Sequence, residues 1–344
     1  MMSRAVLALA LLWPAAVAAE PVTGFRELAL SQPGDGRPLQ GAIWYPAASG
    51  SPTALVGDNP AFVGTPAARD AAAEPGRRPL VVLSHGYGGN ILNQAWLADE
   101  LVRHGYIVAA VNHPGTTSRD RSPAAAEKLI ERPHDLSRAI DTLTADAALS
   151  ALIDTDRIAV VGHSLGAWTV TSIAGGRFDA GRLDADCKAH PALAACDVFA
   201  ALGAGRTAAG RAALGGDARD ARVKAAVMLD IGLARGFTPE SLGAIGIPVL
   251  VIAAGSDDLK IPAALESGYL LQHLPAGATQ SLTIGDATHF SFLPVCKDGA
   301  AALLEAEQRG DGVVCIDGGK GDRKTIHRQA GERILTFLAQ ALGR

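Results

Sequence analysis

The fold of this 344-residue chain is decided by the stretch Ile158-Ala159-Val160-Val161-Gly162-His163-Ser164-Leu165-Gly166-Ala167. A short apolar run, typical of a buried strand, passes directly into a Gly-x-Ser-x-Gly turn, and a helical pattern follows. Glycines are needed on both sides of the serine, because side chains there would collide with the strand and the helix. The pattern therefore predicts a strand–turn–helix unit that presents the Ser164 hydroxyl as a nucleophile at the positive end of a helix.

Similar apolar runs alternate with helical patterns on both sides of this unit. Continuous apolar runs flanked by helices indicate parallel strands that are buried on both faces. We therefore predict a doubly wound, mostly parallel α/β sheet, in which ligands bind beyond the carboxyl ends of the strands. The predicted strands are Pro79–Leu83, Tyr106–Val111, Ile158–Val161, Ala225–Leu229 and Pro248–Ile252, and the predicted helices are Leu92–His104, Asp135–Leu152, Gly166–Ala174, Ala263–Leu274 and Thr325–Leu342.

Three segments lie outside this alternation. Phe25–Leu30 and Leu39–Tyr45 flank a turn and predict an antiparallel hairpin. Pro46–Arg78 is rich in Ala, Pro and Gly without apolar periodicity, which indicates a surface loop. Gly176–Ala221 is too long for a simple connection and is interpreted as an inserted cap.

A second glycine-rich turn follows the strand that begins at Pro79. The stretch Leu83-Ser84-His85-Gly86-Tyr87-Gly88-Gly89 is either a plain turn or the loop that supplies one oxyanion amide. Because it reaches the same edge of the sheet as Ser164, we predict an oxyanion hole formed by the backbone N–H groups of Tyr87 and Leu165. The rings of Tyr87 and Trp168 are predicted to line the substrate site.

The serine needs a base and an acid, which are expected later in the chain. His289, in a short loop after the extended run Gln280–Ile284, is the predicted base. Asp258, three residues after Gly255, is the preferred acid, with Asp257 next. Asp230, which follows the predicted strand Ala225–Leu229, is the alternative acid. In this arrangement the histidine takes the serine proton and the aspartate fixes its tautomer, so neither a cofactor nor a metal is required.

The four cysteines form two local pairs in the sequence, which predict the disulfides Cys187–Cys196 and Cys296–Cys315. Proximity is only a preference, because four cysteines allow three pairings. A zinc site is the competing use, but no Cys-x-x-Cys or His-x-x-x-His spacing supports it.

The first 19 residues predict a secretory signal peptide. They combine Arg4, an apolar run and small residues before Glu20, whereas a membrane anchor needs a longer run of about 20 residues. Residues 20–344 would then form one domain with an inserted cap, secreted or in the periplasm, with no membrane span left after cleavage. The net charge of −4 argues against nucleic acid as a partner.

Several of these stretches together resemble the α/β-hydrolases. The resemblance runs through nearly all of residues 20–344 and is nearest to bacterial dienelactone-hydrolase-like and platelet-activating-factor-acetylhydrolase-like serine esterases. It implies an ester hydrolase that uses Ser164, an aspartate and His289. The stretches that carry it are Ala42-Ile43-Trp44-Tyr45-Pro46, Leu83-Ser84-His85-Gly86, Val111-Asn112-His113-Pro114-Gly115, Arg132-Pro133-His134-Asp135-Leu136, Gly162-His163-Ser164-Leu165-Gly166 and Thr288-His289-Phe290.

The chain departs from this resemblance at one position and leaves another open. Dienelactone hydrolases use a cysteine nucleophile, whereas this chain has Ser164. The resemblance to the acetylhydrolase branch implies an acid at the end of the strand before the last one, which here would be Asp230. The pattern of the wider superfamily favours Asp258.

The expected function is cleavage of small or lipid-like carboxylic esters through a covalent acyl-enzyme. Aryl esters and polyesters are a possible subset of substrates. Acyl transfer to an alcohol or amine by the same three residues is the main alternative, and peptide cleavage is a further one. A non-catalytic binding module is disfavoured, because each catalytic role has a candidate in the expected order.

Overall fold

The computed structural model describes residues 22–30, 37–256 and 260–343. The predicted signal peptide, residues 1–19, lies outside the described residues, as do Asp257 and Asp258.

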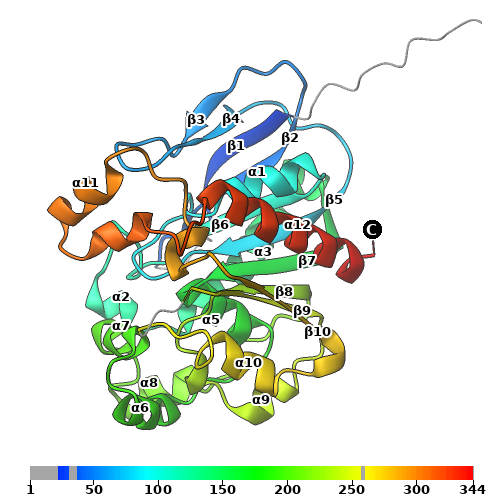
Figure 1. Ribbon diagram of the computed structural model, residues 1–344. Coiled ribbons are helices and arrows are strands. Elements are labelled where there is room, and N and C mark those ends of the chain that lie inside the picture. Colours follow the sequence, from blue (N-terminus) through cyan, green and yellow to red (C-terminus); the bar gives the residue numbers. More distant parts are fainter. Residues whose placement is uncertain (1–21, 31–36, 257–259, 344) are drawn as a thin grey trace, which may run out of the picture.

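The described chain is built around one mixed sheet of ten strands (Figure 1). Their order across the sheet is β10-β9-β8-β7-β5-β6-β2-β1-β4-β3. The six strands from β10 to β6 pair in parallel, and β2 is antiparallel to both β6 and β1. The sheet is therefore mostly parallel, as predicted. The strands are β1 Val22–Ala29, β2 Gln40–Ala47, β3 Ala54–Val56, β4 Thr65–Arg69, β5 Arg78–Ser84, β6 Ile107–Asn112, β7 Ile153–His163, β8 Val223–Leu229, β9 Val249–Ala254 and β10 Thr279–Ile284.

Helices cover both faces of this sheet and fill the connections between its strands (Figure 1). The α-helices are α1 Ala95–Arg103, α2 Pro123–Ala126, α3 Glu131–Ala145, α4 Ala147–Ser150, α5 Leu165–Ile173, α6 Ala180–Ala189, α7 Ala194–Leu202, α8 Ala208–Leu214, α9 Pro239–Gly243, α10 Ser267–His273, α11 Ala300–Glu307 and α12 Arg323–Ala341. The 3₁₀-helices are η1 Ala234–Gly236, η2 Ala276–Ala278, η3 His289–Phe292 and η4 Asp311–Cys315.

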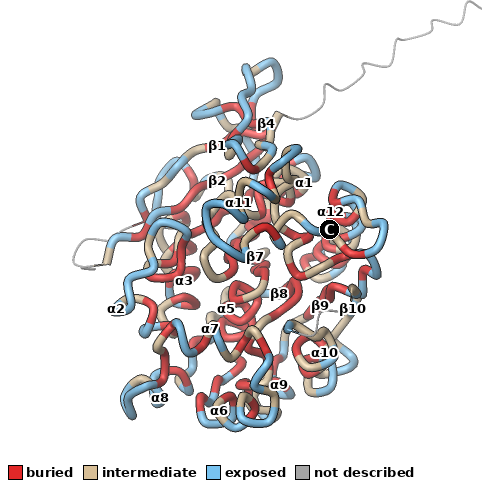
Figure 2. Tube along the Cα trace, turned by 60° about the vertical axis from the view of Figure 1, so that its left-hand side comes forward, coloured by how far each residue is buried: buried red, intermediate tan, exposed pale blue. Residues whose placement is uncertain are grey.

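Two hydrophobic cores lie on opposite faces of the sheet. Leu80 and Val82 of β5 belong to the core under α3, α5 and α10, whereas Val81 and Leu83 belong to the core under α1 and α12. Alternate residues of one strand point to opposite faces, so an uninterrupted apolar run contributes side chains to both cores. Figure 2 shows the buried residues concentrated along the central strands and the helices packed on them.

The N-terminal region confirms one prediction and corrects another. The expected hairpin is present, because β1 and β2 pair antiparallel along their whole lengths. The stretch 46–78, expected to be a loop, contains β3 and β4 instead, and β4 pairs in parallel with β1. Strands this short carry too few residues for an apolar period to show in the sequence.

The segment 176–221 contains three of the helices, α6, α7 and α8, between α5 and β8. They lie together at the lower end of the molecule in Figure 1. Both predicted disulfides are present, with Cα–Cα distances of 5.6 Å for Cys187–Cys196 and 5.7 Å for Cys296–Cys315. Across the described ranges, no helix is both long enough and apolar enough to span a bilayer.

Candidate active site

Ser164 stands on a strained turn between β7 and α5. Its backbone has φ 57° and ψ −119°, a conformation that L-residues rarely adopt. A Cβ on Gly162 would lie 2.1 Å from the carbonyl oxygen of Gly166, and one on Gly166 would lie 1.9 Å from that of Ser84. Both glycines of the motif are therefore required by close backbone approach, as the sequence predicted.

A hydrogen-bonded chain of three side chains begins at this serine. Nε2 of His289 lies 2.8 Å from Oγ of Ser164, and Nδ1 of His289 lies 2.6 Å from Oδ2 of Asp230. His289 begins η3, and Asp230 follows the last residue of β8. Because the carboxylate accepts from Nδ1–H, Nε2 is left free to accept the serine proton.

Asp230, the alternative acid of the sequence analysis, is thus the carboxylate that bonds to His289. Its other oxygen accepts the Ala254 N–H at 2.8 Å, and its backbone adopts φ 40°. These contacts aim the carboxylate from the end of β8 across the end of β9. The preferred Asp258, and Asp257, lie outside the described residues, but the Nδ1 position they were expected to fill is taken by Asp230.

His163 supports His289 from behind. Its Nε2–H donates to the carbonyl oxygen of His289 at 2.7 Å, and the two rings are 4.9 Å apart. Burial, followed by the nearby charge of His289, lowers the pKa of His163 to about 3, so this ring is neutral at physiological pH. It therefore acts as a hydrogen-bond donor and not as a second base.

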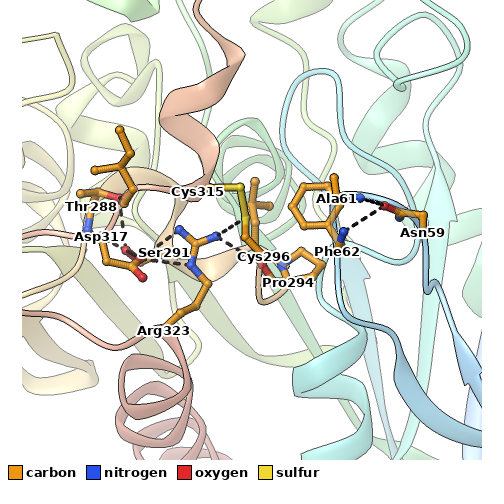
Figure 3. The surroundings of a disulfide bond; sticks show 12 residues. Asn59, Ala61, Phe62, Thr288, Ser291, Pro294, Cys296, Cys315, Asp317 and Arg323 are labelled. Atoms are coloured by element: carbon orange, nitrogen blue, oxygen red, sulfur yellow. Dashed lines mark hydrogen bonds and ion pairs between the residues drawn. A yellow bond between two sulfur atoms is a disulfide. The ribbon is translucent and has the colours of Figure 1, made fainter. Parts of the chain in front are cut away.

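The loop that carries His289 is fastened to the segment around the second disulfide (Figure 3). Thr288 Oγ1 donates to the Ile316 carbonyl at 2.8 Å, and the Ser291 hydroxyl donates to the Asp317 carboxylate. The guanidinium of Arg323 donates to the same carboxylate at 2.9 Å. The backbone of residues 61–63 pairs with residues 295–297, which adds a contact from the N-terminal part of the chain.

The predicted oxyanion amides belong to loops that meet at Ser164. A Cβ built on Gly86 would lie 3.2 Å from Cβ of Ser164, so the loop with Tyr87 passes directly beside the nucleophile. Among the hydrogen bonds of the described residues, none uses the backbone N–H of Tyr87 or of Leu165 as donor. Two unengaged N–H groups beside the serine are what an oxyanion hole needs.

The two predicted aromatic contacts differ in position. Tyr87 is partly exposed, and the guanidinium carbon of Arg121 lies 5.9 Å from its ring centroid. Trp168 is fully buried, with its ring 5.5 Å from that of Phe178 and 5.9 Å from that of Phe237. The prediction that Trp168 lines the substrate site is therefore wrong, because the first turn of α5 directs this indole into the core.

A second hydrogen-bonded Ser-His-Asp chain, not predicted from the sequence, lies next to the loop that carries Tyr87. Ser84 Oγ is 2.9 Å from Nε2 of His113, and Nδ1 of His113 is 3.0 Å from Oδ2 of Asp135. All three side chains are fully buried. No substrate reaches Ser84, so this chain is structural and Ser164 remains the accessible serine. His113 lies in the stretch Val111–Gly115 and Asp135 in Arg132–Leu136, both of which had carried the family resemblance.

Glu266 is a buried carboxyl group close to the proposed acid. Its Oε2 accepts the Ala234 N–H at 2.7 Å, within the loop that follows Asp230. Burial raises the pKa of Glu266 to about 8, opposed by that backbone hydrogen bond and reinforced by the charge of Asp230. The side chain is therefore largely protonated at neutral pH.

In the described parts of the chain, no three His, Cys, Asp or Glu side chains cluster as a metal site.

Two cavities lie away from the serine, at the helices of segment 176–221. The larger has a volume of about 410 Å³ and includes both cysteines of the first disulfide, and the smaller has a volume of about 350 Å³ and includes Arg235 and Tyr269. Neither is lined by Ser164, Asp230 or His289.

Part of this chain is similar in sequence to known proteins. Residues 75–185, which include Ser164, match the family described as serine aminopeptidase, S33. Cutinase 2 of Thermobifida cellulosilytica is 32% identical over 101 residues, 29% of this chain and 35% of the relative. Cutinase cut1 of Thermobifida fusca is also 32% identical over 101 residues, 29% of each chain. The chain thus spans about a third of the length of the curated relatives it matches.

A solved structure is similar over a much longer range. The ferulic acid esterase from Streptomyces cinnamoneus superposes with a TM-score of 0.64, covering 96% of this chain and 93% of that one, at 22% sequence identity. This likeness extends across the sheet and its covering helices. With the strand order and the position of Ser164, it shows that the chain has the α/β-hydrolase fold.

Proposed function

We propose that this protein is a serine hydrolase that cleaves carboxylic esters through a covalent acyl-enzyme. The observation that carries the proposal is the hydrogen-bonded chain from Ser164 through His289 to Asp230, built on a strained strand–turn–helix. Hydrogen-bonded, aligned Ser-His-Asp side chains activate an accessible serine for attack on a carbonyl carbon.

In the first half-reaction, Ser164 Oγ attacks the ester carbonyl while His289 Nε2 takes its proton. The imidazolium is stabilised by Asp230, which accepts from Nδ1. His289 then gives the proton to the leaving alcohol as the tetrahedral intermediate collapses. In the second half-reaction, His289 activates water, which attacks the acyl-enzyme and releases the acid.

The negative charge of each tetrahedral intermediate would lie between the N–H groups of Tyr87 and Leu165. These donors are fixed before substrate arrives, so they stabilise the transition state with little reorganisation. Removal of one such donor typically lowers kcat by about 10²- to 10³-fold. The positive end of α5, which begins at Leu165, favours the same charge.

The substrate class is proposed from the site and from the names of similar proteins. The relatives are cutinases, and the similar structure is that of a ferulic acid esterase, so polyesters and aryl esters are the leading candidates within the broader class. Tyr87 belongs to the loop that passes beside the nucleophile, and its partly exposed ring would suit a flat acyl group. If Tyr87→Ala kept full activity on an aromatic ester, this stacking would be refuted.

We also propose that the protein is exported and that it has a cap. Two disulfides fit an exported protein, which agrees with the signal peptide predicted for residues 1–19, and segment 176–221 would act as the cap. The narrower resemblance to dienelactone-hydrolase-like and acetylhydrolase-like esterases rests on the motifs alone.

The first experiment is hydrolysis of p-nitrophenyl esters from acetate to palmitate by the protein and by Ser164→Ala. The proposal expects turnover that the variant loses, with a release of one nitrophenol per enzyme in the first turnover if deacylation is slow. Equal rates in both proteins would refute it. An added alcohol separates hydrolysis from acyl transfer, because a transferase forms a new ester as the main product.

A further inference from the structure

Arg132 is a fully buried cation that lies between the loop of Tyr87 and helix α5, which carry the two proposed oxyanion amides. It comes from the first turn of α3 and is 1% exposed. Guanidinium groups are rarely buried without several acceptors, because desolvation of the charge is costly. The acceptors that surround Arg132 therefore indicate what it holds in place.

On one side, Arg132 is bonded to the loop that carries Tyr87. Its Nη2 donates to the carbonyl oxygen of His85, which fixes the peptide between residues 85 and 86. The His85 ring fixes the next peptide, because its Nδ1–H donates to the Gly86 carbonyl at 2.7 Å. In a trans peptide the N–H points opposite to the C=O, so holding the Gly86 carbonyl sets the direction of the Tyr87 N–H.

On the other side, Arg132 is bonded to the nucleophile helix. Its Nε donates to Thr169 Oγ1 at 2.9 Å, and that hydroxyl donates to the Leu165 carbonyl at 3.0 Å. Leu165 is the first residue of α5 and carries the second proposed oxyanion amide. One rigid, planar group thus connects the backbones that supply both donors.

The buried Ser84-His113-Asp135 chain is hydrogen-bonded to both His85 and Arg132. The His113 backbone N–H donates to His85 Nε2 at 3.2 Å, which leaves His85 protonated at Nδ1, as its bond to Gly86 requires. Arg132 Nη2 also reaches Ser84 Oγ at 3.4 Å. Every ring nitrogen of the two histidines therefore has a defined donor or acceptor role.

We propose that Arg132 is a positioning residue that sets the distance and direction between the Tyr87 and Leu165 amides. This inference rests on the proposed function, because it assumes that these amides bind an oxyanion. It assigns to the buried chain a part in transition-state binding, although none of its members contacts substrate.

The test compares kcat, KM and the affinity for a trifluoromethyl ketone, which adds to Ser164 and places an oxyanion in the hole. In Arg132→Lys and Arg132→Met, we expect kcat to fall by about 10- to 10³-fold, with KM within about 2-fold of the original. The ketone should lose affinity in proportion to kcat. Lys should retain more activity than Met, because it keeps a charged donor.

Thr169→Val provides a second variant that leaves the guanidinium in place. It removes the hydroxyl between Arg132 and Leu165 at nearly constant volume, so kcat and ketone affinity should fall together here too. Arg222→Met is the matched control, because Arg222 bonds Asp141 of the same helix and Asp220, whereas the partners of its guanidinium among the described residues include neither His85 nor Thr169 nor a member of the buried chain. We expect it to keep the original kcat and ketone affinity.

The possible outcomes separate this inference from the proposed function. If the parent protein turns over esters, Ser164→Ala does not, and folded Arg132 or Thr169 variants keep the parent kcat and ketone affinity, the positioning role is wrong while the esterase stands. A loss of kcat without loss of ketone affinity also refutes it. If Ser164→Ala is as active as the parent, the proposed function itself fails. Should both Arg132 variants fail to fold, Thr169→Val decides.

Discussion

Nδ1 of His289 lies 2.6 Å from Oδ2 of Asp230, although 59 residues separate them in the sequence. Asp230 follows β8 and reaches His289 across the end of β9, where its other oxygen is held by the Ala254 N–H. Since a histidine Nδ1–H has one strong acceptor, the carboxylate in this position determines the tautomer of the ring.

Asp230→Asn should therefore nearly abolish ester hydrolysis. An amide at this position no longer fixes the imidazole tautomer or stabilises the imidazolium, and kcat is expected to fall by about 10⁴-fold. The matched control is Asp258→Asn, which we expect to stay within about 2-fold of the parent. Both are measured as kcat on a p-nitrophenyl ester. The reverse ranking would assign the acid to Asp258.

The missing side chain at Gly232 should leave room for a large acyl group. A Cβ at this position would lie 3.8 Å from Ser164 Oγ, with no other heavy atom within 4 Å beyond the adjoining residues, so a side chain would project into open space beside the nucleophile. Gly232→Val should keep acetate hydrolysis within about 3-fold but lower kcat/KM for long or aromatic acyl groups by 10-fold or more, about 1.4 kcal/mol of transition-state binding. Gly246→Val serves as control, because a Cβ at Gly246 would meet no heavy atom within 4 Å. An unchanged acyl profile in Gly232→Val would place the acyl group elsewhere.

Glu266 should make stability fall as pH rises. Burial raises its pKa in the folded protein to about 8, well above its ordinary value of 4.5, so between these pH values the folded state holds a proton that the unfolded state releases. Its stabilising contribution is full below about pH 4.5 and is lost as pH approaches about 8. Thermal unfolding of the parent should therefore move to lower temperature over this range, and Glu266→Gln should show a shallower dependence. Parallel curves for the two proteins would contradict the assignment.

The disulfide Cys296–Cys315 should contribute mainly to stability. It closes a loop with a sequence separation of 19, for which the chain-entropy model gives about 3 kcal/mol. The double serine variant should unfold at a lower temperature, with kcat at 25 °C nearly unchanged, because the bonds of Asp317 to Ser291 and Arg323 still hold the loop of His289. The corresponding variant of Cys187 and Cys196, with a separation of 9, is the comparison. A large fall in kcat in a fully folded variant would show that the disulfide positions His289 directly.

The parts of this protein that the sequence predicted are those governed by local rules. The turn around Ser164 is fixed by two glycines that no larger residue can replace, and His289 follows the last strand of the sheet. Each central strand contains a continuous apolar run, and each disulfide joins cysteines that are near in sequence. These features need no knowledge of which distant residues meet.

Three features could be identified only from the tertiary structure. They are the catalytic acid, the position of Trp168 and the buried Ser84-His113-Asp135 chain. Asp230 and Asp258 both follow strands of the same sheet, and only the direction of the Asp230 side chain across β9 brings it to His289. Trp168 lies four residues after the nucleophile, but α5 is buried on every side and its indole packs in the core. Hydrogen bonds between residues far apart in the chain depend on strand order and helix rotation, which no short stretch of sequence encodes.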